Sequence, residues 1–140
     1  MSEAKIAEIQ ARREQRKAEL EAQRLAQRAK DLEAVDALEE QHGMGRVVVS
    51  DLEFYTPGLP TLVAMLVPNR NQFKRYQDMC AEKKPTAAAL AAELIGDSCL
   101  CYPDKDTHQR VRDAHPGIHV VAATAAIQAS AGHREAEGKE

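Results

Sequence analysis

The sequence predicts an α+β protein that is predominantly helical, with a long N-terminal helix, a β-hairpin and then a cluster of about four helices. Residues 3–42 contain neither Gly nor Pro and consist mainly of residues with high helix propensity. Two runs rich in β-branched residues, 46–53 and 61–67, follow with Pro and Gly between them. The later segments have apolar residues at helical spacing and are separated by Pro or Gly.

The predicted N-terminal helix spans residues 3–42. Since each helical residue adds 1.5 Å, this helix would extend about 60 Å. Its apolar edge repeats at three- and four-residue spacing and comprises Ala4, Ala7, Ala11, Ala18, Ala22, Leu25, Ala29 and Leu32. Val35 and Leu38 strengthen this edge toward the C-terminal end. The helix is therefore either a solvated extension with only its last turns docked or an arm that binds a long helix of another protein.

Residues 46–53 and 61–67 are predicted to form the two strands of the hairpin. The turn lies in residues 56–60, where the sequence Thr-Pro-Gly-Leu-Pro favours turn dihedral angles. Gly43 ends the preceding helix, because Gly adopts the left-handed cap conformation at little cost. An isolated two-stranded ribbon is marginally stable in water, so we expect the later helices to cover the hairpin.

The first helix after the hairpin begins after Pro68, where Asn69 or Asn71 can cap the free backbone N–H groups. Phe73 and Tyr76 lie on its apolar face. We expect this face to lie on the sheet. The alternative is that the two aromatic side chains form an exposed binding patch.

The second helix of the cluster begins after Thr86, which is a good cap residue. The apolar residues expected along its edge are Leu90, Leu94 and Ile95. Small Ala residues surround them, which suits close packing of helices. The apolar pattern continues as far as Tyr102, and Pro103 stops it.

Two further helices complete the cluster. Asp104 can cap a short polar helix that runs to about residue 114, and the sequence His-Pro-Gly at 115–117 then forces a turn. A final helix is expected over residues 118–131. The residues of this helix available for the core are Ile118, Val121, Ala122, Ala125 and Ile127.

We expect three parts along the chain. Residues 1–42 form the long charged helix, and residues 43–132 form a compact α+β domain. Residues 133–140 are predicted to be a disordered charged tail, because they contain nothing to bury.

The composition argues against several classes of function. The net charge is −3, from 19 Lys and Arg against 22 Asp and Glu, so the chain lacks the basic field typical of nucleic-acid binding. No apolar run approaches the roughly 20 residues that span a bilayer, and the N-terminus lacks the layout of a signal peptide. We therefore expect a cytosolic protein with neither nucleic acid nor membrane among its partners.

The three cysteines, Cys80, Cys99 and Cys101, do not predict a metal site. Structural zinc usually takes Cys ligands separated by roughly two to four residues, together with a second ligand pair. Here Cys99 and Cys101 have one residue between them. His115 and His119 are separated by Pro-Gly, so they cannot lie on the same face of one helix. The sequence also contains no Gly-rich phosphate loop and no signature of nucleophilic catalysis. We expect no catalytic residue, no metal and no cofactor.

Residues 43–131 combine these elements in a particular order. Two strands are followed by a Pro-started helix with Phe73 and Tyr76, and then by an Ala-rich helix that runs into Cys-Leu-Cys-Tyr-Pro at 99–103. A short helix leads to His-Pro-Gly-Ile at 115–118, and a helix of small residues comes last. This order resembles the tail assembly chaperones of tailed bacteriophages.

The resemblance implies a non-enzymatic protein of the host cell cytoplasm. Such chaperones bind the long, helical tape-measure protein, keep it soluble and help to recruit the tail-tube protein. Recognition of a helix requires an apolar surface that can lie along it. The candidate partner-binding residues are Leu25, Leu32, Val35, Leu38, Phe73, Tyr76, Val121 and Ala125. A homo-oligomer is also compatible with the sequence.

Two other interpretations stay open. The chain is alternatively a structural component of the virion, such as a neck or tail-associated protein, with its N-terminal helix as a permanent assembly arm. A third interpretation is an adaptor, unrelated to phages, that dimerises through this helix. A chaperone would be absent from finished particles, whereas a structural subunit would be retained in fixed stoichiometry.

Overall fold

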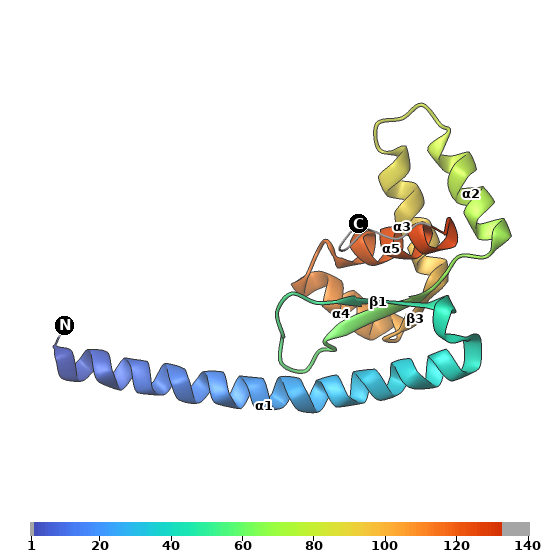
Figure 1. Ribbon diagram of the computed structural model, residues 1–140. Helices are drawn as coiled ribbons and strands as arrows, with labels where there is room; N and C mark the ends of the chain where they lie inside the picture. The colour runs from blue at the N-terminus through green and yellow to red at the C-terminus, as the bar shows by residue number, and fades with distance from the viewer. Residues whose placement is uncertain (1, 133–140) are drawn as a thin grey trace, which may run out of the picture.

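The computed structural model of the protein describes residues 2–132, and the tail predicted at 133–140 lies outside these residues. The helix α1 (Glu3–His42) runs without interruption, as predicted. The Ser2 side chain caps its start by accepting a hydrogen bond from the Lys5 backbone N–H at 3.1 Å. At its end, Gly43 has a φ of 101° and donates its N–H to the Glu39 carbonyl at 2.8 Å. The first half of α1 extends well beyond the rest of the protein (Figure 1).

The predicted hairpin is confirmed. Strands β1 (Val47–Asp51) and β2 (Leu62–Leu66) are antiparallel, with Val47 opposite Leu66. A short 3-10 helix, η1 (Met44–Arg46), connects α1 to β1.

A third strand, β3 (Leu100–Tyr102), was not predicted. It pairs with β2 in an antiparallel arrangement, so that β2 becomes the central strand of a three-stranded sheet. We expected the helical pattern to continue to Tyr102. Pro103 explains the difference, because a residue that precedes proline is biased toward extended backbone.

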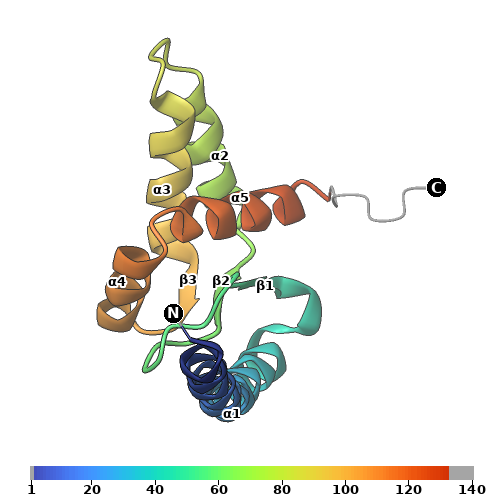
Figure 2. The same ribbon diagram turned by 90° about the vertical axis from the view of Figure 1, so that its left-hand side faces the viewer.

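The helices α2 (Arg70–Cys80) and α3 (Ala87–Cys99) form an antiparallel pair that stands away from the sheet (Figures 1 and 2). Of the two predicted caps, Asn69 and Asn71, it is Asn69 that caps α2, and it forms a reciprocal capping box with Gln72. The expectation that α2 lies on the sheet was wrong, because α2 packs along α3 instead.

The prediction that Leu90, Leu94 and Ile95 form the packed edge of α3 was also wrong in part. Leu90 and Leu94 are exposed, and the buried face consists mainly of small residues. The buried residues are Ala87, Ala91, Ala92, Ile95, Gly96 and Cys99. Small side chains lie inward because α5 approaches this face closely. A Cβ atom on Gly96 would lie 2.9 Å from the Ala123 Cβ atom.

The helix α4 (Lys105–Ala114) begins after its predicted cap Asp104, whose carboxylate accepts from the Thr107 N–H at 3.2 Å. The helix α5 (Ile118–Ser130) packs against both α3 and the sheet. Three layers result, with α1 on one face of the sheet and α5 on the other (Figure 2).

Alternation along β2 builds a core on each side of the sheet, because successive strand residues point to opposite faces. Leu62 and Ala64 pack with Val35 of α1. Val63 and Met65 point the other way and pack with residues of α3 and α5.

Candidate functional site

The second half of α1 is held to the sheet by the buried carboxylate of Asp31. One carboxylate oxygen accepts from the Thr61 backbone N–H at 2.7 Å and from the Thr61 hydroxyl at 2.5 Å. The other accepts from the Gln27 amide at 2.9 Å and from the Tyr102 hydroxyl. Burial, and then the hydrogen bond to Asp31, raise the pKa of Tyr102, so its hydroxyl remains a donor. Arg28 adds an ion pair with Asp51 at 2.6 Å.

The candidate residues of α1 divide between two sides of the helix. Val35 is buried and Leu38 is half-buried, and both pack against the sheet. Leu25 and Leu32 point to solvent, with 54% and 48% of their surface exposed. The four residues predicted as one edge therefore do not form one surface. Sequence reasoning followed the Ala stripe and missed Asp31, although Asp31, Val35 and Leu38 have the spacing of one helical face.

The aromatic residues Phe73 and Tyr76 of α2 are half-buried and pack against the main core. Their ring centroids are 6.1 Å apart. They contribute to the packing of α2 against the rest of the protein. On α5, Val121 is 59% exposed and Ala125 is half-buried, so neither belongs to the buried core expected for this helix.

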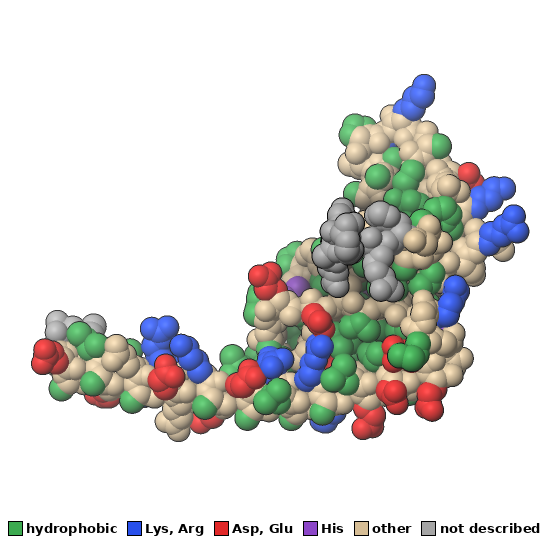
Figure 3. Space-filling view, viewed as in Figure 1, with side chains coloured by type: hydrophobic (Ala, Val, Ile, Leu, Met, Phe, Trp, Pro, Cys, Tyr) green, Lys and Arg blue, Asp and Glu red, His purple; other side chains and the backbone are tan. Residues whose placement is uncertain are grey.

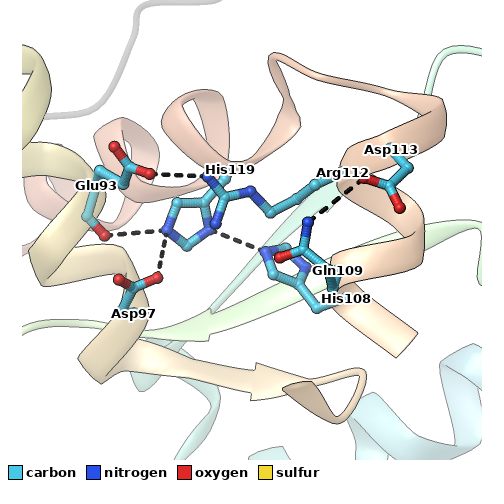
Figure 4. A network of polar contacts seen from close by, with 7 residues as sticks. All are labelled: Glu93, Asp97, His108, Gln109, Arg112, Asp113 and His119. Carbon is cyan, nitrogen blue, oxygen red and sulfur yellow. Dashed lines mark hydrogen bonds and ion pairs between the residues drawn. The ribbon is translucent and has the colours of Figure 1, made fainter. Parts of the chain in front are cut away.

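Two buried histidines, His108 of α4 and His119 of α5, form a polar network that the sequence analysis did not predict (Figure 4). His119 Nε2 lies 3.0 Å from the Glu93 carbonyl oxygen and 3.0 Å from a carboxylate oxygen of Asp97. His119 Nδ1 lies 2.9 Å from His108 Nε2. The Arg112 guanidinium donates to the Glu93 carboxylate at 2.8 Å, which joins α4 to α3.

These contacts assign the tautomers that the two rings have when both are neutral. Because His119 Nε2 faces two acceptors, it carries the proton, and His119 Nδ1 accepts from the N–H of His108 Nε2. His108 Nδ1 is then unprotonated, and it is buried without a hydrogen-bond partner among residues 2–132. Burial, followed by the proximity of His119 and Arg112, lowers the pKa of His108 to about 4. The imidazole is neutral at physiological pH.

The histidine network includes no hydrogen-bonded nucleophile among residues 2–132. In the described part of the chain, no Ser, Thr or Cys side chain hydrogen-bonds to either imidazole. Burial raises the pKa of Cys99, and burial together with Cys99 raises the pKa of Cys101 to about 11. Both thiols therefore remain protonated and poorly nucleophilic at neutral pH. The network connects α3, α4 and α5.

Within residues 2–132, no group of three or more His, Cys, Asp or Glu side chains is arranged to hold a metal ion. None of the helices in this range is long and apolar enough to cross a membrane. Comparison with known proteins finds no matching family model, no matching curated protein and no matching solved structure.

Proposed function

We propose that the chain is a non-enzymatic tail assembly chaperone that binds the tape-measure protein of a tailed phage and aids recruitment of the tail-tube protein in the host cytoplasm. The observation that carries this proposal is the arm, which we define as residues 3–23 of α1. Every residue of the arm is exposed except Ile9, which is half-buried. At 1.5 Å per residue, the arm presents about 30 Å of helix to a partner.

The side chains of the arm suit contact with another helix. Ile6 and Leu20 expose 43% and 40% of their surface among charged residues. Leu25 and Leu32 are also exposed, over the half of α1 that packs on the sheet, and helical geometry places them on a different side of α1 from Ile6 and Leu20. One side of α1 thus holds the helix to the sheet, while these side chains are available to a long helical partner.

Co-expression with the tape-measure protein tests this proposal. We expect the full chain to co-purify with it and to keep it soluble. Deletion of residues 3–23, or the double substitution Leu25→Glu and Leu32→Glu, is expected to abolish co-purification. The matched control, Gln10→Glu with Gln23→Glu, adds two charges at exposed positions of the same helix and should retain binding. Equal binding by all variants would refute a role for α1.

The alternative is a structural protein of the virion, in which α1 is a permanent assembly arm. The fixed attachment of α1 through Asp31 favours this candidate, because a structural connector requires a rigid junction. Quantitative mass spectrometry of lysate and purified particles separates the two functions. A chaperone is abundant in lysate and nearly absent from particles, whereas a virion component is retained in fixed stoichiometry.

A further inference from the structure

A groove of about 710 Å³ lies between the start of α2 and the end of α5. The buried Pro68 and the half-buried Phe73 supply apolar surface to it. Three exposed cations, Arg46, Arg70 and Lys74, line it as well. The remaining lining residues are Asn69, Gln77, Asp78 and Ser130. The groove therefore combines an apolar surface with concentrated positive charge.

The three cations of the groove form no ion pair within residues 2–132. None of Arg46, Arg70 and Lys74 lies within 4.0 Å of a carboxylate there, whereas Arg28 and Arg112 both form ion pairs. The Arg46 guanidinium donates to the Val67 carbonyl oxygen at 3.4 Å. Basic side chains also gather along the outer side of α2 in the space-filling view (Figure 3). A local excess of cations stands out because the whole chain has a net charge of −3.

We infer that this groove binds an acidic segment of a partner protein, with an apolar side chain of that segment against Phe73. Carboxylates accept charge-assisted hydrogen bonds from Arg and Lys, and these are stronger than neutral hydrogen bonds. Contact with Phe73 adds burial of apolar surface. The groove includes no residue of the arm, so the inference goes beyond the proposed function and does not depend on it.

An acidic protein segment fits this groove better than a nucleic acid does. Nucleic-acid binding depends on a basic field that extends along the phosphate backbone. Here three cations line the groove together with the apolar residues Pro68 and Phe73, Asp78 lines it as well, and the chain as a whole is acidic. The combination of carboxylates and an apolar contact is the chemistry of an acidic peptide.

Fluorescence anisotropy with a labelled peptide tests the inference. The probe is a helical peptide of about 12 residues, composed of Glu and Ala with two Leu one turn apart. We expect saturable binding to the full chain that weakens as salt is added. The double substitution Arg70→Glu with Lys74→Glu should weaken binding at least about tenfold. Replacement of the two Leu of the peptide by Ser should also weaken it.

A matched control keeps the experiment specific. Lys83→Glu with Arg110→Glu produces the same change in net charge at exposed positions outside the groove and should retain affinity. If charge reversal unfolds the chain, as judged by circular dichroism, Arg70→Gln with Lys74→Gln provides the test. Equal loss in the control, or no loss in either groove variant, would overturn the inference.

Two other occupants give distinct results. Tighter binding of a single-stranded oligonucleotide than of the peptide, lost in the same groove variants, would identify a nucleic-acid site and overturn the inference. Peptide binding that appears only after removal of residues 133–140 would identify that segment as the natural occupant, and would overturn it as well. Similar affinity of the peptide for the full and the shortened chain supports an acidic partner.

Discussion

The carboxylate of Asp31 accepts hydrogen bonds from both the backbone N–H and the hydroxyl of Thr61, at 2.7 and 2.5 Å. Asp31 lies on α1, and Thr61 immediately precedes the central strand of the sheet. A buried carboxylate is costly unless its lone pairs are satisfied, and here Gln27 and Tyr102 donate to the other oxygen. Asp31 is therefore a fully hydrogen-bonded anchor of α1, beside the Arg28–Asp51 ion pair and the packing of Val35.

Asp31→Ala is expected to destabilise the protein by about 3–5 kcal/mol, because it leaves buried donors of Thr61 and Tyr102 without an acceptor. Urea unfolding followed by circular dichroism measures the loss. Asp36→Ala is the matched control, since it makes the same change at an exposed position of the same helix. Similar stability of the two variants would contradict the role assigned to Asp31.

Gly96→Ala is expected to cost about 1–3 kcal/mol of unfolding free energy by overpacking. A Cβ atom at this position would lie 2.9 Å from both the Ala123 Cβ and His119 Nε2, so α5 would have to shift. Gly45→Ala is the control, because its Cβ would enter open space. The two variants are compared by thermal and urea unfolding. Equal stability would show that α3 and α5 can separate at little cost.

Acidification is expected to destabilise the protein through His108. The pKa of this residue falls from 6.5 to about 4 on folding, so the unfolded chain binds the proton more strongly between these values. The free energy of unfolding has its full value with respect to His108 above pH 6.5, and it decreases progressively as the pH falls toward 4. The decrease is on the order of 3 kcal/mol. His119, Arg112 and Asp97 are the charged or titratable groups that influence His108.

Urea unfolding at a series of pH values between 7 and 4 measures this dependence. His108→Gln should flatten the profile, because it removes the group whose proton affinity changes on folding. His42→Gln removes an exposed histidine and should leave the profile unchanged. A slope that persists unchanged in His108→Gln would assign the pH dependence to other groups.

The features predicted correctly from the sequence depend on local signals. The helix α1 follows from propensity and the absence of Gly and Pro, and the caps Asn69 and Asp104 act within a few residues of their own positions. The hairpin follows from two β-branched runs around a turn. Each of these signals is complete within a short stretch of chain.

The features that were missed depend on distant partners. The strand β3 has three residues, and it forms because β2 offers an unpaired edge to it. Asp31 is polar, so the apolar pattern of α1 gave no signal for it, and Thr61 and Tyr102 complete its hydrogen bonds from elsewhere in the chain. The inward side of α3 was misjudged because close approach of α5 favours small residues over Leu90 and Leu94.

Deletion of the arm, residues 3–23, is expected to leave the compact part folded. The arm is exposed, and the ion pair that crosses the deletion boundary, between Glu21 and Arg24, lies on the surface and contributes little to stability. The helical backbone hydrogen bonds that also cross this boundary belong to α1 itself. The unfolding free energy should change by no more than about 1 kcal/mol. Far-ultraviolet circular dichroism should show the loss of helix, while the urea midpoint stays close to that of the full chain.

A longer deletion, residues 3–35, provides the contrast. It removes Arg28, Asp31 and Val35, so the sheet loses an ion pair, a hydrogen-bonded carboxylate and an apolar contact at once. We expect this variant to unfold at much lower urea concentration or to aggregate, because Leu62 and Ala64 would face solvent. If the shorter deletion destabilised the protein equally, the arm would be a part of the folded unit, and its availability to a partner helix would be refuted.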